Sequence, residues 1–199
     1  MESNTIRRNN VTEQDIVLRA KAGDQKALAE LVTLYTDRIY NLALRILRSR
    51  EDAEDVLQET FLAVVEKLHT FNEKSSFFTW IYRIATNASL MKIRKKRYRF
   101  RELPDRPEFG EQEIIDWSQN PIKEVQNQEI KKILDQAIGE LSDIYRSVFI
   151  LRDIEQLSIR ETAKILDISE ENVKIRLRRA RLFLREKLSA YFTESGVEV

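Results

Sequence analysis

The apolar residues recur at three- and four-residue spacing along most of the chain, and this period constrains the fold more than any other feature. The stripe within residues 27–47 comprises Ala27, Leu28, Leu31, Leu34, Tyr35, Ile39, Leu42, Ala43, Ile46 and Leu47. Such spacing places side chains on one face of an α-helix. Only 4 glycines and 3 prolines occur among 199 residues, which is few for strands joined by tight turns. The sequence therefore predicts an all-α fold.

Interruptions of this period divide the first hundred residues into several helices. A short helix begins near Thr12 and ends at Gly23, and a further helix starts near Glu51. The stripe of that further helix comprises Val56, Leu57, Phe61, Val64, Val65 and Leu68. Residues 72–76 are polar and indicate a loop, after which Phe77 opens another helix. These segments predict an N-terminal helical bundle.

The segment at residues 104–121 differs from everything around it. It contains all three prolines, one glycine and many acids, and it has little regular period. This composition is typical of a linker. A helical pattern resumes near Ile122. We therefore predict two small helical domains, at residues 1–100 and 125–199, joined by a flexible linker at residues 101–124.

The net charge is only +1, but the charges are gathered in blocks of one sign. Residues 92–106 contain eight basic and two acidic side chains, and residues 174–187 contain seven basic and one acidic. Residues 51–59 contain five acids and no base. Separate blocks favour separate partners, namely a polyanion for the two basic blocks and a basic or polar surface for the acidic one. The alternative is that each block is a solvated helix face.

The region from Leu157 to Leu188 predicts a helix-turn-helix. Ser158 and Glu161 form a capping box for a short helix, and Ser169 can cap the next helix after a turn at residues 167–169. In that second helix the inner side is formed by Val173, Leu177, Ala180 and Leu184, and the opposite side by Lys174, Ile175, Arg178 and Arg179. A basic outer face of this kind can enter the DNA major groove. The alternative is an ordinary helical hairpin with a charged exterior.

Two features of the first domain also suggest binding. Phe78 and Tyr82 lie four residues apart, just before the first basic block, and aromatic rings beside a basic surface suit unpaired bases. The loop at residues 71–76 could border a pocket for a flipped base. The rings could instead pack against a neighbouring helix. The acidic stretch at residues 52–59 has an apolar inner side, so it could dock a basic helical partner or simply face solvent.

The sequence gives no indication of catalysis. It has no cysteine and a single histidine, His69, without ligand partners at useful spacing. We therefore expect no enzyme activity, catalytic residue, cofactor, metal or small-molecule substrate. No apolar run approaches the roughly 20 residues of a membrane span, so we expect a cytoplasmic protein without direct membrane insertion.

In their order and spacing, these motifs resemble the extracytoplasmic-function (ECF) sigma factors of bacterial RNA polymerase. The matching stretches are AGDQKALAELVTLYTDRIYNLALRIL, DAEDVLQETFLAVVEKLHTF, SSFFTWIYRIATNASLMKIRKKR and LSIRETAKILDISEENVKIRLRRARLFLREKL. The resemblance implies a sigma region 2 domain and a sigma region 4 domain. It also implies three partners: bacterial core RNA polymerase, promoter DNA and an anti-sigma factor.

The resemblance further assigns roles to individual residues. Core polymerase is expected to bind Asp52, Asp55, Gln58 and Glu59. The minus-ten element is expected to contact Phe71, Asn72, Lys74, Ser75, Ser76, Asn87, Arg94, Lys95, Lys96 and Arg97, together with the aromatic pair Phe78 and Tyr82. The minus-thirty-five element is expected to contact Lys174, Ile175, Arg178 and Arg179, with Arg176 and Arg181 on its phosphates. The polymerase carries out the chemistry, and the chain contributes binding energy to promoter recognition and strand separation.

Three positions depart from the family pattern. Met91 stands where aspartate is common, Asp167 where glycine is frequent, and Ile175 where small or polar residues are usual. A stand-alone helix-turn-helix regulator remains the alternative, although it leaves the acidic and aromatic-basic helices without a role. A helical adaptor that binds only proteins leaves both basic blocks unexplained.

Overall fold

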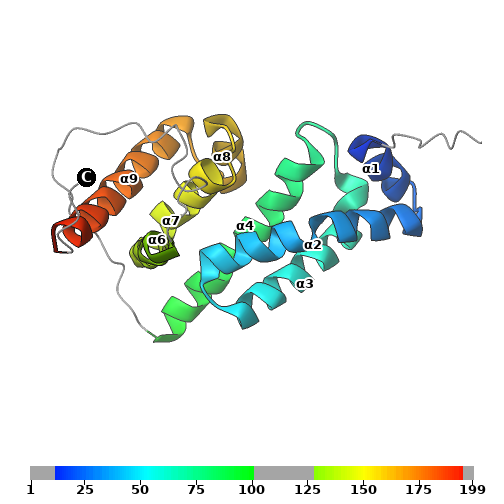
Figure 1. Ribbon diagram of the computed structural model, residues 1–199. Helices are drawn as coiled ribbons and strands as arrows, with labels where there is room; N and C mark the ends of the chain where they lie inside the picture. Colours follow the sequence, from blue (N-terminus) through cyan, green and yellow to red (C-terminus); the bar gives the residue numbers. More distant parts are fainter. Residues whose placement is uncertain (1–11, 101–127, 195–199) are drawn as a thin grey trace, which may run out of the picture.

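The computed structural model describes the backbone of residues 12–100 and 128–194, and the side chains of residues 12–96 and 132–189. Every regular element in these ranges is helical (Figure 1). The elements are α1 (Glu13–Lys21), α2 (Gln25–Leu47), α3 (Arg50–Lys67), the 3-10 turn η1 (Leu68–Thr70), α4 (Phe77–Phe100), α6 (Gln128–Glu140), α7 (Asp143–Phe149), the π-helical turn η2 (Ile150–Ile154), α8 (Ile159–Leu166) and α9 (Glu170–Glu194). The predicted all-α class is confirmed. The predicted linker, residues 101–124, lies outside the described residues.

Polar caps fix where the first three helices begin. The Thr12 hydroxyl accepts a hydrogen bond from the Asp15 N–H over 3.3 Å, and the Asp15 carboxylate accepts one from the Thr12 N–H over 3.0 Å. Asp24 caps α2 and Ser49 caps α3 in the same way, through the N–H groups that a helix start leaves unpaired. Gly23 has a φ of 96°, which glycine adopts without steric cost.

Helices α2, α3 and α4 pack against one another and form the N-terminal bundle (Figure 1). Its centre contains Leu31, Tyr35, Ile39, Val64 and Ile81, all with at most 1% of their surface exposed. At one end the rings of Tyr35, Phe71, Phe77 and Trp80 form a cluster with centroids 5.3–5.9 Å apart. The bundle thereby holds α3 and α4 side by side.

Helices α6 to α9 form the C-terminal domain around a second core. Its buried residues include Ala137, Val148, Val173, Ala180 and Leu184. Helix α9 contacts α6, α7 and α8, so its inner face is covered along most of its described length. The residues on that face are the ones predicted from the apolar period, and the period is confirmed there.

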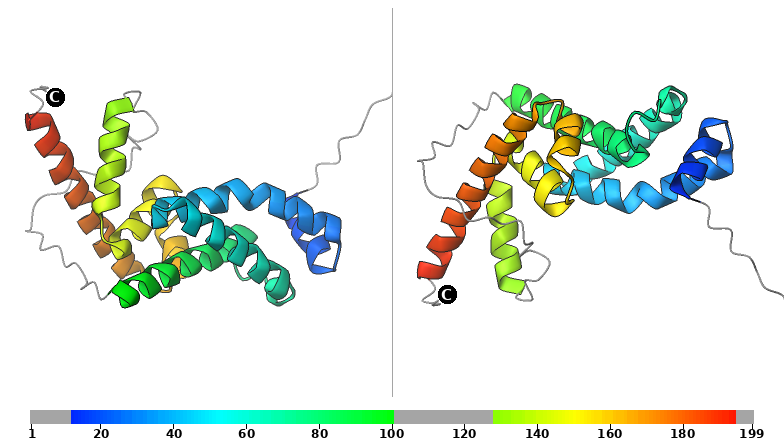
Figure 2. Two further views of the ribbon diagram at one scale, coloured as in Figure 1. Left: turned by 90° about the horizontal axis from the view of Figure 1, so that it is seen from below. Right: turned by 90° about the horizontal axis from the view of Figure 1, so that it is seen from above.

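The two domains are in contact. Helix α8 packs against α4, and the views of Figure 2 show the two helices side by side. Ile150, Leu151, Leu157 and Ile165 of the C-terminal domain belong to the same buried cluster as the core of the N-terminal bundle. The sequence did not indicate this packing, because its apolar pattern only specifies which face of each helix is buried.

Candidate functional site

The outer face of α3 is acidic at its start and apolar toward its end. Asp55, Gln58 and Glu59 are exposed, as expected for a docking surface. One to two turns further on, Leu62 and Val65 are 64% and 56% exposed, although the apolar period placed Val65 on the inner stripe. Positions three and four apart share one helix face, so these five side chains form one surface. We call it the α3 face.

Leu62 was missed in the sequence, and Val65 was assigned to the wrong side of the helix. The available signal was their distance from Asp55, since Leu62 follows it by seven residues and Val65 by ten. Seven residues are close to two helical turns, and ten residues place Val65 within about 80° of Asp55 around the helix axis. Exposed apolar side chains next to exposed acids are a typical composition for a protein-binding surface.

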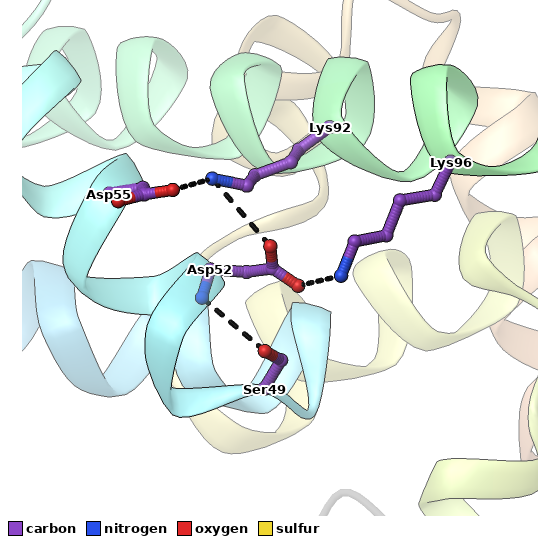
Figure 3. A network of polar contacts seen from close by, with 5 residues as sticks. All are labelled: Ser49, Asp52, Asp55, Lys92 and Lys96. Atoms are coloured by element: carbon purple, nitrogen blue, oxygen red, sulfur yellow. Dashed lines mark hydrogen bonds and ion pairs between the residues drawn. The ribbon is translucent and has the colours of Figure 1, made fainter. Parts of the chain in front are cut away.

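Asp52 does not lie on the α3 face. Its side chain is only 9% exposed and points toward α4 (Figure 3). Its carboxylate accepts a hydrogen bond from the Lys96 ammonium, and its other oxygen lies 3.6 Å from Lys92 Nζ. Lys92 in turn donates to the exposed carboxylate of Asp55. We call Asp52, Asp55, Lys92 and Lys96 the α3–α4 charge network.

The charges in this network shift the pKa values of Asp52 and Lys92. Burial alone would raise the pKa of the Asp52 carboxyl, but the hydrogen bond and charge of Lys96, with help from Ser49 and Lys92, hold that pKa below its usual value. Burial would likewise lower the pKa of Lys92, but the hydrogen bond and charge of Asp55, together with the charges of Asp52 and Glu59, raise it. Both shifts favour the ionised forms of Asp52 and Lys92.

The loop before α4 presents most of its predicted DNA contacts to solvent. Asn72, Lys74 and Ser76 are exposed and Ser75 is half-buried. The Phe71 ring is 4% exposed and belongs to the aromatic cluster. Lys21 of α1 donates a 2.6 Å hydrogen bond to the Phe71 carbonyl, and the Ser76 hydroxyl accepts one from the Thr79 N–H over 3.1 Å. The loop is therefore tied at both ends, with polar side chains exposed at its tip.

The exposed side of α4 continues this polar surface. Asn87, Arg94 and Lys95 are all exposed. Asn87 and Lys95 also line a groove between α3 and α4, together with Glu59, Met91 and Lys92. The side chain of Arg97 lies outside the described residues. Asn87, Lys95 and Lys96 thus share one groove with Glu51, Asp52 and Glu59 of α3.

The aromatic pair predicted to stack on bases lies between the two domains. The rings of Phe78 and Tyr82 contact each other with centroids 4.0 Å apart. Tyr82 is 1% exposed, and its hydroxyl donates a 3.0 Å hydrogen bond to Glu155 of the C-terminal domain. Burial and the Glu155 carboxylate raise the pKa of Tyr82. In this arrangement the Tyr82 ring is covered by protein.

The C-terminal domain contains the predicted helix-turn-helix, formed by α8 and α9 (Figure 1). The Glu161 N–H donates to the Ser158 hydroxyl over 3.1 Å, and Glu161 accepts from the Ser158 N–H over 2.9 Å, which confirms the capping box. Asp167 ends α8 with a φ of 56°. The left-handed conformation explains why glycine suits this position, and aspartate is one of the few other residues that tolerate it.

The six residues of α9 predicted to contact DNA fall into two groups. Lys174, Ile175, Arg178 and Arg179 are exposed, and the Arg179 guanidinium donates to the Tyr145 hydroxyl over 3.0 Å. Arg176 is half-buried. Arg181 makes two hydrogen bonds to Asp153, of 3.0 and 2.8 Å, and both side chains are less than 15% exposed. Arg181 therefore pairs within the domain, and its predicted phosphate contact stays a prediction.

The described part of the chain contains neither a metal-binding cluster nor a membrane-spanning helix. No cluster of three or more histidine or acidic side chains within it could hold a metal ion. None of its helices is both long enough and apolar enough to cross a membrane. His69 is exposed in the middle of the η1 turn.

A helical bundle with an acidic face and a basic helix, packed against a helix-turn-helix domain, defines a two-domain helical DNA-binding protein. The Sigma-70 region 2 family model matches residues 31–99, and the Sigma-70 region 4 family model matches residues 131–184. The ECF RNA polymerase sigma factor SigW of Bacillus subtilis is 36% identical over 178 residues, which cover 86% of this chain and 94% of SigW. The ECF RNA polymerase sigma-E factor of Escherichia coli K12 is 32% identical over 189 residues, 89% of this chain and 95% of that protein.

Solved structures agree with these matches. CnrH, in complex with the cytosolic domain of CnrY, aligns with a TM-score of 0.62 and 25% identity over 89% of this chain and 97% of CnrH. The sigma factor RpoE of Bartonella quintana, in complex with the anti-sigma factor NepR, shares the fold with a TM-score of 0.63 and 22% identity, over 82% of this chain and 98% of RpoE. The chain belongs to the ECF RNA polymerase sigma factors.

Proposed function

We propose that the chain binds bacterial core RNA polymerase through the α3 face and directs it to promoters that its two domains recognise. The observation that carries this proposal is the pairing of opposite surfaces on one bundle. Glu59 of the α3 face and the exposed Glu51 line a groove together with Lys92, Lys95 and Lys96 of the basic end of α4. A protein-binding surface and a nucleic-acid-binding surface on adjacent helices suit a subunit that connects an enzyme to DNA.

In this proposal residues 1–100 act as the region 2 domain. Asp55, Gln58 and Glu59 bind a basic surface of the polymerase, and Leu62 and Val65 add apolar contact area. Asp52 lies on the inner side of α3 and contacts Lys92 and Lys96 of α4, which holds α3 against α4 through the α3–α4 charge network. The exposed side chains of the loop at residues 72–76, with those of α4, hold the separated strand of the minus-ten element.

Residues 125–199 act as the region 4 domain, and residues 101–124 connect the two. Helix α9 enters the major groove of the minus-thirty-five element with the exposed Lys174, Ile175, Arg178 and Arg179. Arginine can hydrogen bond to guanine with two donors, whereas lysine adds attraction to phosphate. The chain itself carries out no reaction, since nucleotide addition belongs to the polymerase, and it works where the polymerase is, in the cytoplasm.

The proposal includes control by an anti-sigma factor. This extends to the present chain what the RpoE–NepR complex from Bartonella quintana shows for a protein of the same fold. The α3 face, with its exposed Leu62 and Val65, is the surface that such a regulator has to cover to prevent polymerase binding.

Co-elution with core polymerase tests the proposal. The full chain is mixed with bacterial core RNA polymerase and run on gel filtration, and we expect a stable complex. The double charge reversal Asp55→Lys with Glu59→Lys should abolish it, because a basic surface then meets a basic partner. The matched control reverses two exposed acids outside α3, Asp37→Lys with Glu186→Lys, and should keep the complex.

Two results would contradict the proposal. If the folded wild-type chain does not co-elute but still binds duplex DNA, the chain acts as a stand-alone regulator. If the α3 variant and the control lose the complex to the same extent, docking depends on total charge and does not use the α3 face.

A further inference from the structure

The α3–α4 charge network joins the surface proposed to bind polymerase to the helix proposed to bind DNA. Lys92 lies between two carboxylates, those of Asp52 and Asp55, while Lys96 binds only Asp52 in this network (Figure 3). The network therefore contains two negative and two positive charges, and each is matched. Helix α3 supplies both acids and α4 supplies both bases.

Exposure differs strongly among the four side chains. Asp52 is 9% and Lys92 20% exposed, whereas Asp55 is 54% and Lys96 55% exposed. A buried carboxylate requires a partner, so Asp52 must keep at least one ammonium. An exposed ion pair contributes little and exchanges readily. Asp55 and Lys96 are thus the two members of the network that an outside charge can reach.

Adding a third cation to this set has a definite consequence. An incoming ammonium or guanidinium that binds Asp55 competes with Lys92 for that carboxylate. Lys92 lies 3.6 Å from the second acceptor, Asp52 Oδ1, and can keep this contact. Two carboxylates then face three cations, and the most exposed cation of the network, Lys96, is the easiest to release. The released ammonium is positioned on the basic part of α4.

We propose that Asp52 is a positioning residue that holds Lys96 against α3 in the free chain, and that a cation docking on Asp55 releases Lys96 for contact with DNA phosphate. This inference rests on the proposed function, because it takes the α3 face to be the docking surface and α4 to be the DNA-binding helix. By linkage, DNA that captures Lys96 strengthens docking on Asp55 by the same factor. Polymerase binding and DNA binding are thus coupled across the two helices.

The salt dependence of DNA binding by the free, full chain tests the hold on Lys96. Affinity for a short fluorescent single-stranded DNA is measured over a range of salt concentrations, without polymerase. Each phosphate contact made by a lysine to a single strand steepens the plot of log affinity against log salt by about 0.7. Asp52→Asn and Asp55→Asn each leave one carboxylate for two lysines, so each should steepen the slope by about 0.7. If the Asp52→Asn variant does not fold because position 52 is buried, the Asp55→Asn variant tests the same expectation.

Three further variants separate positioning from net charge. Glu54→Gln makes the same charge change at an exposed position of α3 outside the network and should keep the wild-type slope. Lys96→Met alone should also keep it, because Lys96 is held away from DNA. Lys96→Met added to Asp52→Asn should return the slope to the wild-type value. The proposal fails if the two aspartate variants keep the wild-type slope, if Glu54→Gln steepens it equally, or if Lys96→Met alone flattens it.

Acetylation followed by mass spectrometry tests the release by docking. Lys96 is compared with its exposed neighbour Lys95 in the free chain and in the complex with core polymerase, without DNA. We expect the Lys96 to Lys95 ratio of acetylation rates to rise in the complex, and an unchanged or lower ratio contradicts the release. If no complex forms, the proposed function fails, and the salt slopes of the free chain still report on Asp52.

Discussion

The Tyr82 hydroxyl in the N-terminal bundle donates a 3.0 Å hydrogen bond to the Glu155 carboxylate in the C-terminal domain. The other oxygen of Glu155 lies 2.5 Å from an Arg45 guanidinium nitrogen, and the Glu155 side chain is 16% exposed. One carboxylate therefore connects α2, α4 and the turn after η2. Because Tyr82 is one of the predicted DNA contacts, this bond links domain packing to access by DNA.

Removing the Glu155 carboxylate should loosen the two domains. Glu155→Ala leaves the buried Tyr82 hydroxyl without its acceptor, which costs about 1–3 kcal/mol. The chain contains no cysteine, so two introduced cysteines, at exposed Asp37 and Glu186, can carry a fluorescent donor and acceptor. We expect lower transfer efficiency in the variant. In the control variant Arg83→Ala, an exposed ion pair between the domains is lost, in which Arg83 lies 3.5 Å from Asp167. The transfer efficiency of this control should stay close to that of the wild type. Equal transfer efficiency in all three proteins would contradict the role of Glu155.

The helix-turn-helix should depend on the cap of α8. Ser158→Ala removes the hydroxyl that accepts from the Glu161 N–H, and should lower the free energy of unfolding by about 1 kcal/mol. Ser142 is a matched control, because it precedes α7 without a side-chain capping bond and its hydroxyl is buried without a described partner. Ser142→Ala should be close to neutral. Urea denaturation of both variants checks this, and equal losses would mean that the Ser158 cap contributes nothing specific.

The charge network should make stability depend on pH in the acid range. The folded-state pKa of Asp52 lies below the unfolded value of about 3.9. Its contribution is therefore fully present above pH 4 and is lost as the pH falls through the folded-state pKa. The difference in unfolding free energy between the wild type and Asp52→Asn should shrink over that interval. A difference that stays constant down to the lowest accessible pH would show that the ionised carboxylate is not what stabilises the fold.

Two arginines of α9 should behave in opposite ways. Arg178 is exposed, so Arg178→Ala should flatten the salt dependence of duplex binding by about 0.9 and leave unfolding unchanged. Arg181→Ala leaves the buried Asp153 unpaired and should destabilise the domain by about 3 kcal/mol. Thermal unfolding and DNA titration of both variants separate the two roles. A loss of DNA affinity in a stably folded Arg181→Ala variant would restore the phosphate contact predicted from the sequence.

Features that depend on short-range spacing were predictable from the sequence. The capping box of Ser158 and Glu161 spans three residues, and Val173, Leu177 and Ala180 repeat with the helical period. The same patterns located the acidic segment of α3 and the basic segment of α9. Resemblance to a family then assigned roles that spacing alone left open.

Contacts between distant segments were not predictable in this way. Asp52 pairs with Lys96, 44 positions later, and Arg181 pairs with Asp153, 28 positions earlier. Asp52 and Arg181 were both predicted to be exposed contacts, but in the structure both side chains point inward. Val65 shows the converse, since the apolar period assigned it to the core but no neighbouring helix covers it in the described structure. Local periodicity specifies a helix face, and only the packing of helices decides which part of that face stays accessible.

Transcription by core polymerase from a library of random promoter sequences tests the central claim most directly. Core enzyme is incubated with the library alone, with the wild-type chain, or with the Asp55→Lys, Glu59→Lys variant, and the start sites are sequenced. We predict that only the wild-type chain gives new start sites, preceded by one shared pair of minus-ten and minus-thirty-five sequences. The same start sites with and without a folded, DNA-binding chain would contradict its assignment as a promoter-specificity subunit.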